Sequence, residues 1–164
     1  MRIRDFQLSD AQPVRDLALR CWRHTYADIY SGREIDEFIG SFYSDEVNAV
    51  TLRMMRDGTA SYQVLILDDE VAGFQTASIA DGAELRRLYV DPPLIGKGYG
   101  KALLLSAEAY FRSCMMGRYT VKVHERNSLG IGFYSRQGFL PVGREDSDLI
   151  YEKFLGQTGG PRPL

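Results

Sequence analysis

The stretch LYVDPPLIGKGYGKALL, residues 88–104, joins an apolar strand to an apolar helix through two prolines and three alternating glycines, which are Gly96, Gly98 and Gly100. Glycines lose much backbone entropy on folding, so some interaction has to offset that loss. The first N–H groups of a helix have no intrahelical partner, and the helix dipole favours negative charge there. With Lys97 and Lys101 beside them, these groups predict a main-chain cradle for a pyrophosphate. A glycine-rich turn without any ligand is the alternative.

Two familiar phosphate motifs do not fit this stretch. A P-loop requires a hydroxyl after its lysine, where the sequence has Ala102. A dinucleotide-binding fingerprint requires a third glycine, where the sequence has Lys101. Pro92 and Pro93 stop the preceding strand from continuing its ladder, which frees main-chain groups for an extended, amide-bearing ligand.

Length and charge limit the classes of protein. A chain of 164 residues with net charge −2 predicts one globular domain, over residues 1–155, and argues against nucleic acid as the main partner. The Gly- and Pro-rich residues 156–164 are expected to form a flexible tail. The charged start lacks the apolar core of a signal peptide, and no apolar run suits a membrane. We therefore expect a cytoplasmic protein without a membrane partner.

Cysteine and histidine are too sparse for metal chemistry. The two cysteines, Cys21 and Cys114, lie far apart in helix-like segments and are expected to be reduced thiols. Neither they nor the two histidines show the spacing of a zinc site. No metal site is predicted, and no Cys–His arrangement supports a covalent acyl-enzyme.

Hydrophobic periodicity predicts an α/β (α+β) fold. Apolar residues three and four apart predict helices, and alternation between Asp or Gly turns predicts strands. The helices are expected over 14–26, 33–44, 46–58, 98–112 and 127–138. The strands are expected over 1–6, three times within 61–90, and over 118–125, 139–145 and 149–155. Because strands alternate with helices in the middle of the chain, at least one pair should be parallel, in a mixed sheet with helices on both faces.

Two motifs resemble the GNAT superfamily of N-acetyltransferases. Residues 88–104 look like its acetyl-CoA-binding motif, Gln/Arg-x-x-Gly-x-Gly/Ala, with Gly98 and Gly100 in place but Ile95 at the first position. The stretch NSLGIGFYSRQGF, residues 127–139, resembles the family segment N-x-x-A/G-x-x-F-Y-x-x-x-G-F. The resemblance covers about residues 1–155 and implies a mostly antiparallel sheet whose central parallel pair of strands is splayed.

The resemblance also implies how acetyl-CoA is held. Main-chain groups near Leu88, Tyr89 and Val90 would pair with the pantetheine arm and polarise the thioester carbonyl. Asn127 would hydrogen-bond the same arm, although a helix N-cap is its structural alternative. The loop would bind the pyrophosphate, through the residues Ile95, Gly96, Lys97, Gly98, Tyr99, Gly100 and Lys101.

Two side chains are predicted to move protons. Tyr134, seven residues after Asn127 and so on nearly the same side of the helix, is implied to protonate the departing thiolate. A half-buried core aromatic is the alternative for Tyr134. Glu84 is the candidate base for the amine, directly or through water, and a solvated strand end is its alternative. Glu125 is the second choice as base.

The acceptor site is expected in the first helices. Trp22, Tyr26 and Tyr30 would form an aromatic wall, which vaguely resembles polyamine-acetylating members of the family, while core packing is the alternative. The acids expected to attract a cationic amine are Asp28, Glu34 and Asp36. The acceptor is expected to be a small-molecule or peptide amine. A non-catalytic acyl-CoA sensor, a protein acetyltransferase and a homodimer, which is common in the family, remain open alternatives.

Overall fold

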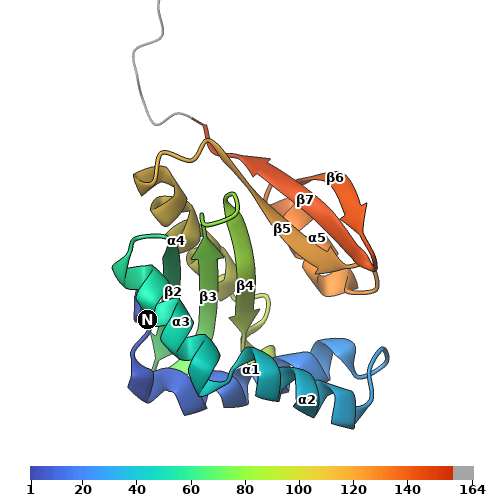
Figure 1. Cartoon of the computed structure of the whole chain (residues 1–164). Helices are drawn as coiled ribbons and strands as arrows, with labels where there is room; N and C mark the ends of the chain where they lie inside the picture. Colours follow the sequence, from blue (N-terminus) through green and yellow to red (C-terminus); the bar gives the residue numbers. More distant parts are fainter. Residues whose placement is uncertain (157–164) are drawn as a thin grey trace, which may run out of the picture.

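One mixed sheet organises the computed structural model, which describes residues 1–156 (Figure 1). The strands in spatial order are β1 (Arg2–Asp5), β2 (Ala60–Leu67), β3 (Glu70–Ser78), β4 (Glu84–Val90), β5 (Arg118–His124), β7 (Asp148–Phe154) and β6 (Leu140–Glu145). All neighbours are antiparallel except β4 and β5, which are parallel. The predicted mixed, mostly antiparallel sheet is therefore confirmed.

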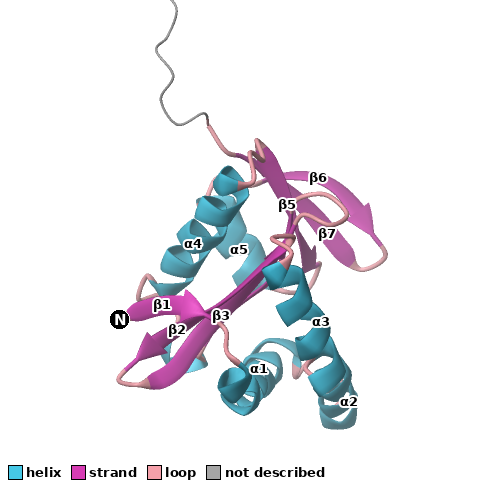
Figure 2. Ribbon diagram, turned by 60° about the vertical axis from the view of Figure 1, so that its left-hand side comes forward, coloured by secondary structure: helices cyan, strands magenta, loops and turns pink. Residues whose placement is uncertain are grey.

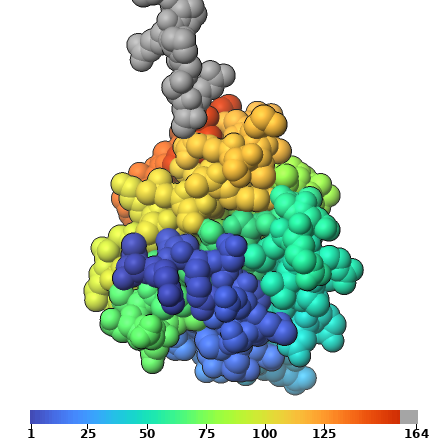
Figure 3. All heavy atoms as spheres, turned by 90° about the vertical axis from the view of Figure 1, so that its left-hand side faces the viewer, coloured from blue at the N-terminus to red at the C-terminus, as the bar shows by residue number. Residues whose placement is uncertain are grey.

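Helices cover both faces of this sheet, as predicted (Figures 1 and 2). On one face lie α1 (Ala11–Tyr26), α2 (Gly32–Phe42) and α3 (Asp45–Arg56), and on the other lie α4 (Tyr99–Ser113) and α5 (Ser128–Arg136). Short 3₁₀ turns, η1 (Leu8–Asp10) and η2 (Pro92–Leu94), precede α1 and the glycine loop. Figure 3 looks onto the β1 edge, where the dark blue strand lies at the surface between α3 and the yellow α4.

Two main hydrophobic clusters follow from this layering. Strands β2 and β3 are buried over most of their length because helices pack on both of their faces. The first cluster joins α1 and α2 to β2 and β3 through residues such as Leu17, Ile35 and Phe74. The second joins α4 and α5 to β5 and β7 through residues such as Phe111 and Val121. The first cluster thus lies on β2 and β3, while the second spans both halves of the sheet, because it also includes Ala77 of β3 and Leu85 of β4.

Local interactions fix the turn between β2 and β3 and the start of α1. Asp68 and Asp69 link β2 to β3 with φ of 49° and 63°, as a tight hairpin turn requires. Asp10 occupies the N-cap position of α1, but its side chain makes no cap hydrogen bond. Its carboxylate instead accepts two hydrogen bonds from Arg4, at 2.7 and 2.9 Å, and one from the Gln7 N–H. This carboxylate therefore fixes β1 to the start of α1.

The two halves of the sheet separate soon after they meet. Only Glu84↔Thr120 and Leu85↔Val121 pair β4 with β5. Arg86 is an extra residue in β4, because Ala77 opposes Leu85 while Thr76 opposes Arg87. Such a bulge bends the strand, and β4 then runs away from β5. The predicted tail, apart from Gly156, lies outside the described residues.

Candidate active site

A cavity of about 410 Å³ fills the gap between the separated strands. Its walls are the unpaired ends of β4 and β5, and its remaining sides are the glycine loop, the start of α4 and one side of α5. It is lined by ten of the twelve residues predicted to bind the cofactor, namely Leu88, Tyr89, Val90, Ile95, Gly96, Gly98, Gly100, Lys101, Asn127 and Tyr134. The other two, the exposed Lys97 and the partly buried Tyr99, are not in this lining.

The glycine loop presents main-chain donors to the cavity. Gly96 and Gly98 have φ of 84° and 89°, and Gly98 is the N-cap of α4. Those angles are strained for residues with a side chain, which explains glycine at both positions. Among the described residues, no protein acceptor takes the N–H of Gly96, Gly98, Tyr99, Gly100 or Lys101. These five donors fit the oxygens of a diphosphate.

The charge of the lining also fits an anion. Within the part of the chain that the structure describes, the cavity is lined by five cationic residues and no acidic one; they are Arg86, Arg87, Lys101, Lys122 and Arg136. Of these five, only Lys101 was predicted from the sequence to contact the cofactor. In β5, Lys122 lies between Val121 and Val123, and successive side chains of a strand point to opposite faces of the sheet. This alternation could have predicted that Lys122 lies on the face away from the two buried valines.

Side chains of helix α1 hold the end of β4 where this strand no longer pairs with β5. The Cys21 thiol donates to the Val90 carbonyl at 3.3 Å, and the Trp22 Nε1–H donates to the Tyr89 hydroxyl at 3.0 Å. Arg20 pairs with Asp91 at 2.9 Å, just beyond the strand. The Tyr89 ring therefore points toward α1, and its main chain lines the gap. Burial raises the pKa of the Cys21 thiol to about 12, so Cys21 is an uncharged thiol.

Asn127 caps α5 and reaches across to α1. Its Oδ1 accepts from the Gly130 N–H at 2.9 Å, and its Nδ2 donates to the Tyr26 hydroxyl at 3.3 Å. A Cβ on Gly130 would lie 2.8 Å from Asn127 Nδ2. Glycine at 130 therefore makes room for the capping side chain.

Tyr134 lies in α5, with only 8% of its surface exposed, and it lines the cavity. Burial, with a smaller contribution from Tyr26, raises its pKa above the ordinary value near 10 for a phenol. The hydroxyl is therefore protonated at neutral pH, the state in which it can donate a proton.

The predicted base and two of the three residues of the predicted aromatic wall are not in the cavity lining. Glu84 starts β4, where the strand still pairs with β5, and is not in the cavity lining; its Oε2 lies 3.9 Å from Arg86 Nε. Of the wall residues, only Tyr26 lines the cavity. Ring centroids of Tyr26 and Tyr30 lie 4.8 and 6.4 Å from that of Trp22, so the three do form one aromatic group.

A mixed sheet opened at its parallel pair, with unpaired N–H groups and cations at the opening, is the arrangement of an acyl-CoA-binding acyltransferase. The family model for the acetyltransferase (GNAT) family matches residues 12–139. The chain belongs to this family and is an acetyl-CoA-dependent N-acetyltransferase that acts on amines. The alternative of a non-catalytic sensor is thereby removed.

Individual relatives agree with this assignment. The spermidine N(1)-acetyltransferase of Thermoplasma acidophilum is 34% identical over 158 residues, which cover 93% of this chain and 96% of the relative. The crystal structure of the PaiA N-acetyltransferase from the same organism, in complex with coenzyme A, superposes with a TM-score of 0.89 at 33% identity, covering 94% of this chain and 98% of that one. A peptidyl-lysine N-acetyltransferase of Salmonella typhimurium is 28% identical over 78% of this chain and 77% of its own.

Other features of the described residues bear on partners. None of their helices is long and apolar enough to cross a bilayer. Nor do their His, Cys, Asp and Glu side chains form a group of three or more that suits a metal ion.

Proposed function

We propose that this protein acetylates a primary amine of a small polycationic molecule such as spermidine, by direct attack within a complex that also holds acetyl-CoA. The observation that carries the choice of acceptor is the aromatic group beside the cavity, since aromatic faces attract alkylammonium ions. The relative that acts on spermidine, matched over nearly its whole length, supports the same choice. A peptide lysine is the second candidate, favoured by the Salmonella relative.

The main chain of the cavity supplies the cofactor contacts in this proposal. The five N–H donors of the loop bind the diphosphate, with Lys101 beside them. The unpaired edge of β4 from Leu88 to Val90 hydrogen-bonds the pantetheine arm, as an added strand would. An N–H at Leu88 or Tyr89 stabilises negative charge on the thioester oxygen. Acetyl-CoA itself supplies an acetyl group on a good thiolate leaving group.

Tyr134 acts as the general acid in this scheme. The neutral amine attacks the thioester carbonyl carbon, the new C–N bond forms and the C–S bond breaks. The Tyr134 hydroxyl then gives its proton to the departing thiolate. Its enclosed position keeps that proton on the oxygen until the thiolate appears.

Glu84 is the proposed acceptor of the proton that the amine loses. Because Glu84 is not among the residues that line the cavity, the proton passes to it through water in this proposal. Glu125 is less suitable, because its carboxylate pairs with Arg144 at 2.6 Å.

Steady-state assays with acetyl-CoA test the function, with spermidine, a monoamine and a lysine peptide as acceptors. Tyr134→Phe is expected to lower kcat at least about tenfold while the Kd of acetyl-CoA, measured by calorimetry, stays the same. An unchanged kcat would remove Tyr134 from the mechanism. Turnover of the peptide alone would replace the polyamine with a protein acceptor.

A further inference from the structure

Two of the three acids that the sequence offered for a cationic acceptor, Glu34 and Asp36, are engaged elsewhere. The Glu34 carboxylate accepts the Ser31 N–H at 2.7 Å and so closes the capping box of α2. The Asp36 carboxylate pairs with Arg23 at 3.0 Å on the exposed side of the helices. That leaves the exposed Asp28, or a carboxylate of another element, to face the aromatic group if that group is to receive a cation.

Asp148 is placed for this role by the register of the sheet. It is the first residue of β7 and lies directly opposite His124, the last residue of β5. Side chains of opposed antiparallel residues share a face of the sheet and lie close together. The His124 ring lies with its centroid 6.2 Å from Tyr26 and 6.0 Å from Tyr30. The carboxylate of Asp148 therefore borders the aromatic group.

Within the described residues the Asp148 carboxylate makes no ion pair, although its charge is one of the smaller contributions that raise the pKa of Lys122. Among the described residues, no Lys, Arg or His nitrogen lies within 4.0 Å of its carboxylate, although Asp148 is only partly exposed. The nearby Lys122 of β5 pairs with Glu145, the residue of β6 that lies opposite Asp148. The pKa of Tyr26 is raised by burial first and by the negative charge of Asp148 in addition, which agrees with a carboxylate that borders this wall.

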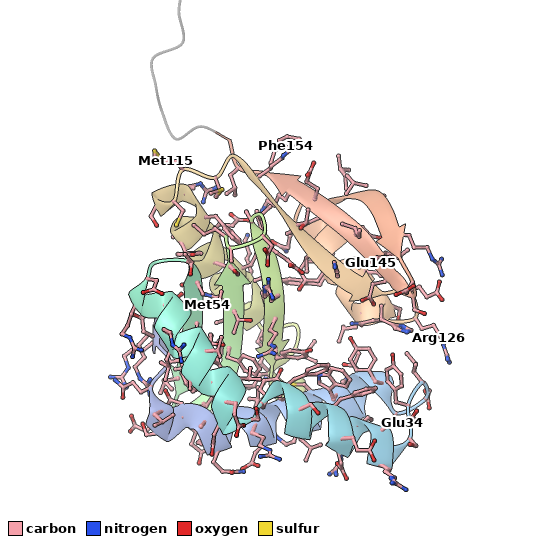
Figure 4. The ribbon with its side chains drawn as sticks, in the orientation of Figure 1. Glu34, Met54, Met115, Arg126, Glu145 and Phe154 are labelled. Carbon is pink, nitrogen blue, oxygen red and sulfur yellow. The ribbon has the colours of Figure 1, made fainter. Side chains whose placement is uncertain are left out.

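The surroundings of Asp148 close one side of the cavity mouth. Tyr26 both lines the cavity and contacts Asn127, while Tyr30 and His124 lie outside the lining. A side chain also bridges this side, because Arg126 Nη2 donates to the main-chain carbonyl of Asp28 at 3.3 Å. Figure 4 shows Arg126 and Glu34 on the two sides of this junction, from the β5–α5 turn and from α2. A ligand that leaves the cavity past Tyr26 therefore passes Asp148.

We propose that Asp148 binds a second ammonium group of the acceptor, with the Tyr26, Tyr30 and His124 rings flanking the carbon chain between the two nitrogens. This inference rests on the proposed function and assigns the residue that selects amines with two or more positive charges. The reacting amine would lie in the cavity and the second ammonium outside it, on the far side of the Tyr26 ring.

Putrescine and butylamine test the proposal, because they share one carbon chain but carry two charges and one. Asp148→Asn is expected to lower kcat/KM for putrescine by about tenfold or more, the usual effect of losing a charge-assisted contact. The value for butylamine and the KM of acetyl-CoA should stay within about twofold of wild type. Asp148→Glu should restore part of the preference for putrescine.

Asp146→Asn is the matched control. Asp146 lies at the exposed tip of the same hairpin with φ of 50°, a conformation that asparagine adopts readily, so the variant removes the same charge without touching the wall. Equal losses for the two amines, or the same loss in Asp146→Asn, would overturn the role of Asp148. So would a wild-type enzyme without a preference for putrescine. A protein that binds acetyl-CoA but turns over no amine would instead remove the proposed function.

Discussion

The two ends of the gap between β4 and β5 are built differently. At the closed end, two residue pairs join the strands, and a buried network lies beneath them. There the Glu108 carboxylate of α4 accepts from the Tyr119 hydroxyl of β5 at 2.8 Å and pairs with Lys153 of β7 at 2.6 Å. At the open end, the side-chain contacts across the gap are long, at 3.3 Å from Asn127 to Tyr26 and from Arg126 to Asp28.

Along this one pair of strands, the closed end serves stability and the open end serves ligand binding. The closed end holds the two hydrophobic clusters together and contributes no residue beyond Val121 and Arg86 to the cavity. The open end leaves main-chain donors unpaired, which costs free energy unless water or a ligand satisfies them. We therefore expect substitutions at the closed end to act on the free energy of unfolding, and those at the open end to act on ligand binding.

The largest effect is expected from Glu108→Ala. Glu108 is 2% exposed, and its removal leaves the Tyr119 hydroxyl and the Lys153 ammonium without their acceptor. We expect a loss of about 3 kcal/mol in the free energy of unfolding, measured by urea denaturation. Glu108→Gln, which keeps an oxygen for Tyr119, should lose roughly half as much. A loss below about 1 kcal/mol in the alanine variant would mean that the network does not join the halves.

The next effect is expected from Gly98→Ala at the open end. Alanine at φ of 89° is strained by roughly 1–2 kcal/mol, and no protein atom lies within 4 Å of its methyl group, which therefore occupies open space at the loop where the anion is expected. The Kd of acetyl-CoA, measured by calorimetry, should rise about tenfold. Gly58→Ala, at φ of 76° and with no atom within 4 Å of the added methyl, is the control for strain alone. A Kd that rises equally in both variants would place the cradle elsewhere.

The cofactor side of the site was predictable because its determinants are local. Glycine at φ above zero, two prolines and the start of a helix fix the loop within a few residues, and ten of the twelve predicted residues line the cavity. Lys97 falls outside because successive residues of a tight loop point in different directions. The bulge at Arg86 was not predicted, since it depends on the register with β3.

The acceptor side was less predictable because its charges depend on distant partners. Asp36 belongs to α2, yet its partner Arg23 comes from α1, and Glu34 is used by its own helix cap. Asp148 lies 122 residues after Tyr26, and only the pairing of β7 with β5 brings them together. A sequence shows which acids exist, but the sheet decides which of them remain without a cation.

A smaller effect is expected from Tyr26→Phe. This variant keeps the ring and its packing against Trp22 but removes the acceptor of the Asn127 hydrogen bond. One neutral hydrogen bond contributes about 1 kcal/mol, so we expect the KM of acetyl-CoA to rise roughly threefold to fivefold with kcat nearly unchanged. Trp22→Phe, which breaks a contact to Tyr89 on the far side of β4, is the comparison. If kcat fell as it does in Tyr134→Phe, Tyr26 would belong to the chemical step.

The smallest effect is expected from alkaline pH, through Tyr134. A general acid works in its protonated form, and burial raises the pKa of Tyr134 above its ordinary value near 10, so the active form persists beyond that pH. The kcat at saturating substrates should therefore show no decline up to about pH 10 that depends on Tyr134. Profiles of wild type and Tyr134→Phe, measured on the same amine, separate this group from the titration of the amine itself. A decline in kcat that is centred well below pH 10 in the wild type and is absent from the variant would show that the phenol is exposed to solvent. The open end of the gap would then be wider than the contacts of Tyr26 and Asn127 allow.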